Sequence, residues 1–449
     1  MMKSILYMIL SGALVLTGCS PVPGGASAQG SVPAPEPVVR ALSQPVYPEF
    51  PTLPQFQDNG EDYWKQTEQY YETVEQIRGS KLVPELLQSL NEFAGASTAL
   101  ALDGQKGKNA IYSPVSLWAA LAMAAQCAEG DSRTQVLNAL GAESVEDLQE
   151  QVSQVWRRLY TENGTSSLLL ANSIWLDSGK PGNYVQETLD TLSEQYFAGT
   201  YCVPMGTAEA DKAVTEWISQ QTNGLIGSGD PVVETDALTL ALLVSTLYYR
   251  AGWKDAFQPE QTWQDDFTNG QGQTAQTAFM HRTASGNWCK AEGYQAAALS
   301  TDLGEMVFVL PDEGTAPESL LQDSDFLGKL EFDRFGPVEW SVPKFDVNSD
   351  LDLMETLHKL GVTDLLSPGK ADLSALTDLE ASLSDAKQLA RVKVDEEGVE
   401  AAAATILSFK LTGATIEDPE VCVMDLDRPF LFVIRTENIP LFVGVVNQV

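Results

Sequence analysis

The sequence VKVDEEGVEAAAAT occupies residues 392–405, near the end of a chain of 449 residues. Its four consecutive alanines favour a helix, because alanine has the highest intrinsic helix propensity. The residues that follow, ILSFKLTGATIEDPEVCVMD, show no helical period and contain Gly413 and Pro419. Taken alone, the segment is consistent with an exposed alanine-rich helix, and its role has to be judged from the rest of the chain.

The charge of the chain argues against one class of partner. Its formal net charge is −35, whereas binding to nucleic acid requires clustered Lys and Arg. A charge this negative favours solubility and repulsion from anionic surfaces. Length alone predicts two or three domains, because one domain usually holds about 100–200 residues.

The first nineteen residues have the features of a targeting segment. Lys3 precedes an apolar run at residues 5–16, which is too short to span a bilayer comfortably. The run ends in LTGC, which resembles the lipobox of bacterial lipoproteins, in which the cysteine, here Cys19, is lipidated. This resemblance implies an extracytoplasmic protein anchored by lipid at the outer face of a bacterial cell membrane. The alternative is a secretory leader with an incidental cysteine.

Residues 20–81 are expected to form a tether and a short helix. The part up to Pro54 is rich in Pro, Gly, Ala and Ser and cannot bury enough apolar surface to fold alone. Residues 61–79 read as a helix that carries Trp64, Tyr70 and Tyr71. Packing of these aromatic side chains on the main domain is favoured over a binding role.

The remainder, from residue 82, reads as helices followed by strands. Apolar residues at helical spacing predict four helices, at residues 82–102, 113–128, 131–142 and 145–160. Ser113 and Pro114 fit the N-cap and the first position of the second one. Runs rich in β-branched and aromatic residues predict strands at 168–176, 237–250, 305–311, 338–347, 429–435 and 441–449. This segregation predicts an α+β fold.

The sequence carries little sign of catalytic chemistry. It has two histidines, His281 and His358, and no GxSxG, HExxH, phosphate-loop or dinucleotide-binding motif. The cysteines other than Cys19 lack the spacing of a zinc site, so no metal or cofactor is expected. Buried free thiols are the favoured reading of these cysteines, which are Cys127, Cys202, Cys289 and Cys422. A hydrolase is kept as an alternative only because residues distant in the sequence could form a catalytic triad in the folded protein.

An ordered set of motifs resembles the serpin family of serine protease inhibitors. The set comprises NAIYSPVSLWAALAMAAQCAEGDSRTQVLNALG (109–141), TLYYRAGWKDAF (246–257), VPKFDV, LHKLGVTDLL, VKVDEEGVEAAAAT (392–405), DRPFLFVIR and PLFVGVVNQ. It covers about residues 82–449 in the family's order. The resemblance implies a single domain with three β-sheets, eight or nine helices and an exposed reactive loop at about residues 396–420, in place of the two or three domains that length predicts.

In this family the segment at 392–405 is the hinge of the reactive loop, which inserts as a strand into the central sheet after cleavage. Side chains alternate in a strand, so an inserted hinge would turn Glu400, Ala402 and Ala404 outward. Gly398 is expected to give the pivot torsional freedom. The hinge residues implied by the resemblance are Glu396, Gly398 and the inward set Val399, Ala401, Ala403 and Thr405. Because the inward set is small or β-branched, inhibition is favoured over a non-inhibitory, binding role.

The family's spacing places the scissile bond between Thr412 and Gly413. A small residue at this position suits an elastase-like or subtilisin-like protease. Cleavage after Leu411 would suit a chymotrypsin-like enzyme, and cleavage after Lys410 a trypsin-like one. The implied partner is a serine protease, held as a covalent acyl complex by a monomeric inhibitor.

The resemblance also implies a polar cluster that controls opening of the central sheet. Its expected polar members are Ser113, Ser116, Ser245 and Gln388, and the residues implied to control sheet opening also include Trp253, the tryptophan of the strand and turn at 246–257. The family usually has asparagine where this chain has Ser245 and histidine where it has Gln388. Both side chains can still form hydrogen bonds, so these departures put the stability of the uncleaved state in doubt more than the fold.

Overall fold

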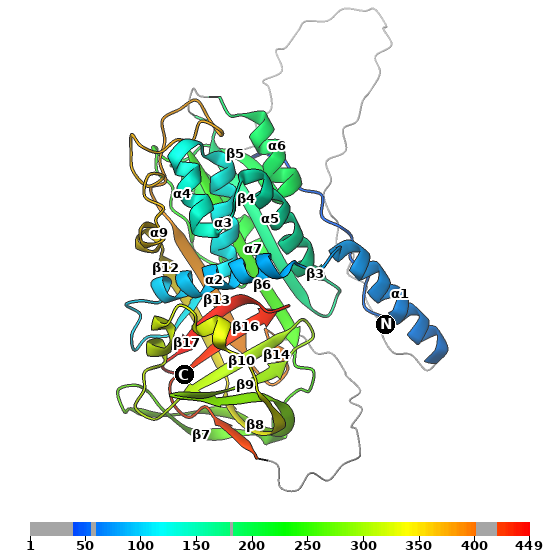
Figure 1. Cartoon of the computed structure of the whole chain (residues 1–449). Helices are drawn as coiled ribbons and strands as arrows, with labels where there is room; N and C mark the ends of the chain where they lie inside the picture. Colours follow the sequence, from blue (N-terminus) through cyan, green and yellow to red (C-terminus); the bar gives the residue numbers. More distant parts are fainter. Residues whose placement is uncertain (1–38, 55–59, 180–182, 401–419) are drawn as a thin grey trace, which may run out of the picture. The chain divides into compact units, whose positions relative to one another are not determined.

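The computed structural model describes residues 39–54, 60–179, 183–400 and 420–449 (Figure 1). These residues form an α+β fold in which α-helices prevail early and strands prevail late. The α-helices are α1 (Gly60–Arg78), α2 (Pro84–Ala101), α3 (Pro114–Cys127), α4 (Gly130–Leu140), α5 (Val145–Leu159), α6 (Gln186–Gln195), α7 (Ala208–Gln221), α8 (Phe326–Lys329) and α9 (Met354–Lys359). Two 3₁₀ helices lie at Pro259–Gln261 and Pro317–Gln322.

The central sheet has eight strands, in the order β1-β5-β4-β6-β14-β13-β12, with β3 paired to β4. Their bounds are β1 Arg40–Ser43, β3 Thr161–Glu162, β4 Ser167–Asp177, β5 Ala198–Val203, β6 Ala241–Gly252, β12 Phe345–Asp352, β13 Lys387–Val394 and β14 Gly398–Val399. Helix α3 packs against β6, and α5 packs against β4, as Figure 1 shows. The sheet therefore has a helical layer on one face.

The other nine strands form one hydrogen-bonded network, in the order β15-β11-β8-β9-β10-β16-β17-β2, with β7 paired to β8. Their bounds are β2 Ala110–Tyr112, β7 Thr262–Thr268, β8 Thr274–Ala291, β9 Tyr294–Ser300, β10 Glu305–Pro311, β11 Arg334–Pro343, β15 Cys422–Asp425, β16 Phe430–Thr436 and β17 Ile439–Val446. The three sheets expected from the sequence thus appear as two networks. The 18-residue strand β8 joins the two smaller sheets, since it pairs with β7 along its first part and with β9 along its last four residues.

Helix α3 is the buried helix of the fold, enclosed by other helices and strands. It is apolar on nearly every face and almost entirely buried, as expected for a helix enclosed by other elements. Ser113 is its N-cap and accepts a hydrogen bond from the backbone N–H of Ser116, and Pro114 follows at the first helical position. The predicted start of this helix is confirmed.

The packed part of the chain begins well before residue 82, which corrects the boundary expected from the sequence. Strand β1 pairs with the edge of β5. Tyr47 stacks on Trp156 and Tyr160, with ring centroids 5.2 and 5.4 Å away. The Pro-rich composition did not predict this packing, since such a segment does not fold alone. A few aromatic side chains can nevertheless fix an extended segment on a domain that is already folded.

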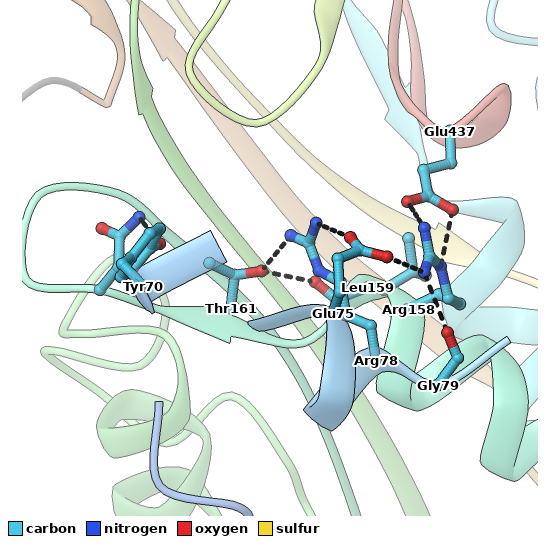
Figure 2. Close-up of polar contacts among 9 residues, drawn as sticks. Tyr70, Glu75, Arg78, Gly79, Arg158, Leu159, Thr161 and Glu437 are labelled. Atoms are coloured by element: carbon cyan, nitrogen blue, oxygen red, sulfur yellow. Dashed lines mark hydrogen bonds and ion pairs between the residues drawn. The ribbon is translucent and has the colours of Figure 1, made fainter. Parts of the chain in front are cut away.

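Helix α1 is held against α5 by a buried arginine (Figure 2). Arg158 is 3 % exposed and forms ion pairs with Glu75 of α1 and with Glu437, in the turn between β16 and β17. Its guanidinium also donates to the carbonyl of Gly79. Tyr70 is buried, as expected from packing on the domain, whereas Trp64 and Tyr71 remain exposed. In the described residues, no helix is both long and apolar enough to cross a bilayer.

Candidate functional site: an open position in the central sheet

Strand β14 lies between β6 and β13 and is antiparallel to both, so β6 and β13 run parallel to each other. Gly398 and Val399 pair with Gly252 and Ala251 on one side, and Val399 pairs with Val394 on the other. However, β14 has two residues, whereas β6 has twelve and β13 has eight. Over the rest of their length β6 and β13 do not pair in the described part of the chain. At the β14 end, therefore, β6 and β13 lie one strand apart, with two residues of β14 between them.

The turn that leads into β14 is fixed by backbone and indole hydrogen bonds. The indole Nε1 of Trp253 donates to the carbonyl of Asp395 at 2.9 Å, and its backbone N–H donates to Glu397 at 3.0 Å. The backbone N–H of Phe257 donates to the carbonyl of Glu396 at 3.0 Å. Trp253 is 2 % exposed, so its ring is a buried support under the turn. Trp253 therefore supports the turn that leads into β14, while its implied role in sheet opening stays a prediction.

Glu396 forms the main charged contact of the turn. Its Oε2 lies 2.7 Å from Nζ of Lys344, and its side chain is 17 % exposed. Burial is the largest single effect and acts to raise the pKa of the Glu396 carboxyl, but the hydrogen bonds to this carboxyl, of which that from Lys344 is the strongest, together with the Lys344 charge outweigh burial, and the pKa is lowered. Lys344 lies in the motif VPKFDV, but the sequence does not predict its pairing with Glu396, because the two residues are 52 positions apart.

Gly398 is required by close approach of two backbones. A Cβ atom at this position would lie 2.3 Å from the carbonyl oxygen of Ala251 and 2.8 Å from Cα of Gly252. The residue does not adopt a left-handed φ. The expectation of torsional freedom is therefore wrong, and the reason for glycine is the space between β14 and β6.

Strand β14 ends because Glu400 turns out of the sheet. Its φ is +46°, a left-handed value that costs a non-glycine residue about 1 kcal/mol. A small pocket opens where the next strand residues would continue. Its lining combines apolar side chains from the core with charged groups from the rim: Leu225, Leu247, Tyr249, Arg391, Val392, Lys393, Val399, Glu400, Ile434 and Phe442.

The side chains that flank the open position alternate in a way that defines its inner face. On β13 every second residue is buried, among them Ala390, Val392 and Val394. On β6 the residues of the same face, Leu247, Tyr249 and Ala251, are at most 8 % exposed, and Thr246 and Tyr248 between them are buried as well. Val399 of β14 shares this face and is 2 % exposed. An additional strand would therefore place every second side chain against an apolar surface.

The side-chain amide of Gln388 on β13 forms two hydrogen bonds with the backbone of Ser113, and this pair of hydrogen bonds is called the Gln388 clasp below. The backbone N–H of Ser113 donates to Oε1 at 2.6 Å, and Nε2 donates to the carbonyl of Ser113 at 2.9 Å. The hydroxyls of Ser113 and Ser116 lie 3.0 Å apart. Three of the four expected cluster residues therefore meet, and they join β13 to the start of α3.

Ser245 does not join this cluster, which corrects the expectation. Its hydroxyl is buried without a hydrogen-bond partner among the described residues. It pairs in register with Asn172 of β4, whose side-chain oxygen also lacks a partner in the described chain.

Comparison with known proteins identifies the fold. The family model "Serpin (serine protease inhibitor)" matches residues 88–449. The chain belongs to the serpin family. A relative, serine proteinase inhibitor A3K of Cavia porcellus, is 30% identical over 379 residues, which cover 80% of this chain and 88% of that protein.

Solved serpin structures agree with this assignment. The native state of the thermophilic serpin tengpin matches with a TM-score of 0.72 and 25% identity, over 82% of this chain and 96% of that one. Thyroxine-binding globulin in complex with thyroxine matches with a TM-score of 0.69 and 24% identity, over 81% and 99%. The serpin fold and the α+β class expected from the sequence are confirmed.

The Gln388 clasp should contribute measurably to the stability of this serpin. In the Gln388→Leu variant the buried N–H of Ser113 loses its acceptor, which costs about 2 kcal/mol. We expect chemical denaturation to show this loss, and Gln195→Leu, which changes an exposed glutamine, to leave the free energy of unfolding unchanged. Equal stabilities for both variants would contradict the clasp.

Glu400 is half-buried beside three basic residues. Burial raises its pKa to about 7, although a hydrogen bond with Tyr248 and the charges of Arg391, Arg250 and Lys393 act in the opposite direction. Arg391 also pairs with Asp346, because its Nε and Nη2 donate to the two carboxylate oxygens. The carboxyl of Glu400 is therefore not freely solvated, and its outward orientation in an inserted strand stays a prediction.

The raised pKa of Glu400 makes stability depend on pH. The folded state binds the proton more tightly than the unfolded state, whose pKa is near 4.5, so stability falls as pH rises from about 4.5 to 7. We expect Glu400→Gln to raise Tm relative to wild type, little at pH 4.5 and most at pH 8. Glu397→Gln, at an exposed position in the same turn, should give a pH-independent difference.

Several sequence-predicted residues lie outside the described residues. These are the lipidation site Cys19, the hinge residues Ala401, Ala403 and Thr405, and the reactive-bond candidates Lys410, Leu411, Thr412 and Gly413. The described cysteines Cys127, Cys202, Cys289 and Cys422 are buried free thiols, as expected.

The histidines do not assemble a catalytic group in the described chain. His281 lies flat against Trp263 with ring centroids 3.6 Å apart, and its Nε2 is buried without a hydrogen-bond partner there. A serine nucleophile needs that nitrogen as its base. His358 is exposed on α9, as the sequence predicted. The described residues also contain no cluster of three or more metal-ligating side chains.

Proposed function

We propose that this serpin is an irreversible suicide-substrate inhibitor of serine proteases. The observation that carries the proposal is the open position between β6 and β13, with β14 already occupying its first two residues. In this proposal residues that follow Val399 extend β14 after cleavage and complete the sheet. The left-handed Glu400 would then become extended and release its backbone strain.

The register of β14 predicts the partners of the inserted hinge. Val399 pairs with Ala251 and Val394. In an antiparallel pair, each step forward along one strand matches one step back along its partner. Thr405, six residues after Val399, would therefore lie between Ser245, six residues before Ala251, and Gln388, six residues before Val394. The hydroxyl of Thr405 would then supply the hydrogen-bond partner that Ser245 lacks. Insertion would thus satisfy a buried polar group as well as add backbone hydrogen bonds.

The chemistry of trapping uses the catalytic serine of the target. Its oxygen would bond to the carbonyl carbon of Thr412, the amide bond to Gly413 would break, and the Gly413 nitrogen would leave with a proton as a free amine. The acylated Thr412 end then moves with the inserting loop. The protease would be carried along and distorted before water could hydrolyse the ester.

The expected target is an elastase-like or subtilisin-like protease, because Thr412 is small. Cleavage after Leu411 or Lys410 instead would indicate a chymotrypsin-like or trypsin-like target. Mass spectrometry of the C-terminal peptide released by the protease distinguishes these bonds directly.

Two other functions remain as alternatives. The serpin fold is shared by thyroxine-binding globulin, which the structure shows with thyroxine, so a non-inhibitory binding role is one. A lipoprotein hydrolase is the other, and the separation of His281 from any nucleophile among the described residues argues against it.

Mixing the protein with elastase, subtilisin, chymotrypsin and trypsin tests the proposal. Inhibition predicts an adduct of serpin and protease that survives denaturing electrophoresis. Cleavage of the serpin without an adduct would favour the binding role. Intrinsic hydrolytic turnover that His281→Ala abolishes would favour the hydrolase.

We also propose that lipid on Cys19 anchors a monomeric inhibitor at the outer face of a bacterial membrane. The support is the order of charge, apolar run and cysteine at residues 1–19. Detergent phase partition of protein from cells tests this anchor. Wild type should enter the detergent phase and Cys19→Ser should stay in the aqueous phase; the same partition for both would rule the anchor out.

A further inference from the structure

Four large apolar side chains are exposed on the sheet that receives the end of the reactive loop. Trp263 on β7 is 51 % exposed, Phe335 on β11 is 74 %, and Val423 on β15 is 51 %. Val421, which directly precedes β15, is 43 % exposed. Exposed apolar residues scattered singly are normal, but a group on one surface indicates an interaction site.

Strand register shows that these side chains share one face. Val423 pairs with Glu339 of β11, so Val421, Val423 and Glu339 point the same way as Phe335, an even number of residues from Glu339. The opposite face of the same strands is buried, with Val338 and Cys422 at 0 and 2 % exposed. Outward-facing residues of β8 extend this surface as far as His281.

Trp263 lies at the far end of this surface, stacked on His281. His281 pairs with Ser341 of β11, and Ser341 pairs with Asp425 of β15, so the apolar groups are joined through neighbouring strands. The surface is called the outer β15 face below; its apolar members are Trp263, Phe335, Val421 and Val423. Exposed carboxylates surround it at Asp265, Glu339, Glu420 and Asp425.

We infer that the outer β15 face is a second docking surface for the target protease, beside the reactive loop. This inference rests on the proposed function. The described chain resumes at Glu420, next to Val421 and in an ion pair with Arg334 at 2.9 Å. A protease bound at Thr412 is therefore at most about 27 Å of extended chain from this face. A catalytic domain of about 230 residues has a radius of gyration of about 17 Å, so its body reaches the face.

The size and charge of the face fit this occupant. Strand spacing and rise give it dimensions of about 15 by 20 Å, or about 300 Å². A stable interface buries about 800 Å² per partner, so the face is too small for a dimer alone but can add to the contact made by the loop. Its carboxylate rim, on a chain of net charge −35, selects a protease whose active-site entrance is apolar with a basic rim.

Association kinetics of a double variant that introduces positive charge, Phe335→Lys with Val423→Lys, test the inference. Leu238→Lys changes a leucine that is 85 % exposed in the segment before β6 and serves as the matched control. The probe is whichever of elastase, subtilisin, chymotrypsin and trypsin forms the adduct fastest with wild type. We expect the double variant to slow adduct formation at least tenfold, with unchanged stoichiometry and unchanged Tm, and the control to match wild type.

Three outcomes would overturn the inference. If wild type forms an adduct and the double variant matches its rate within twofold, the face is not a docking surface, while the proposed function stands. If wild type forms no adduct with any of the four proteases, both proposals fail. If gel filtration shows a wild-type dimer that the double variant converts to monomer, the face serves self-association instead.

Discussion

Replacing Ala403 with glutamate should convert the inhibitor into a substrate. Extension of the β14 register brings position 403 between Leu247 and Ala390 on the inner face, where both side chains are at most 8 % exposed. Burying an unpaired carboxylate there costs at least about 3 kcal/mol. Insertion should slow about 100-fold, so the acyl-enzyme is hydrolysed first. Denaturing electrophoresis should show cleaved serpin and free protease in place of the adduct.

Ala402→Glu is the control for this prediction, because alternate residues of a strand face opposite sides. The register brings position 402 beside Arg391 on the outer face, where a carboxylate can pair. This variant should keep most of its adduct yield. Equal adduct yields from both variants would mean that the hinge does not enter the sheet in this register.

The sequence predicted local structure well where a residue's role depends on its neighbours in the chain. Ser113 and Pro114 indicate the start of α3 correctly. The suitability of residues 401–405 for a strand stays a prediction, because they lie outside the described residues. The assignment of Gln388, Ser113 and Ser116 to one cluster came from resemblance, and the structure brings the three together.

The errors concern contacts between distant segments. The reason for Gly398 depends on the backbone of β6, and the lack of a hydrogen-bond partner for the Ser245 hydroxyl among the described residues depends on strands distant in sequence. The packing of Tyr47 on Trp156 joins residues more than a hundred positions apart. Composition and periodicity contain no signal for such pairs, because each side chain looks ordinary in its own segment.

Cleavage of the reactive loop should raise the thermal stability of the protein by about 10 °C or more. The edges of β6 and β13 beyond β14 can accept roughly a dozen additional backbone hydrogen bonds, each worth about 1 kcal/mol net. A domain of about 360 residues unfolds with an entropy of about 0.8 kcal/mol/K at Tm. A gain of about 10 kcal/mol therefore corresponds to a shift of about 13 °C.

A matched control separates insertion from the effect of the cut itself. Ala403→Glu, cleaved at the same bond, should gain much less than wild type, because its hinge cannot enter the apolar inner face. A full gain in this variant would assign the stabilisation to something other than insertion.

The central claim is that the intact molecule holds a vacant strand position that the cut loop fills. Differential scanning calorimetry of the intact protein and of the protein nicked in residues 410–413 tests it most directly. The claim predicts that the nicked protein melts about 10 °C or more above the intact one. Equal melting temperatures, or a lower one after nicking, would contradict it.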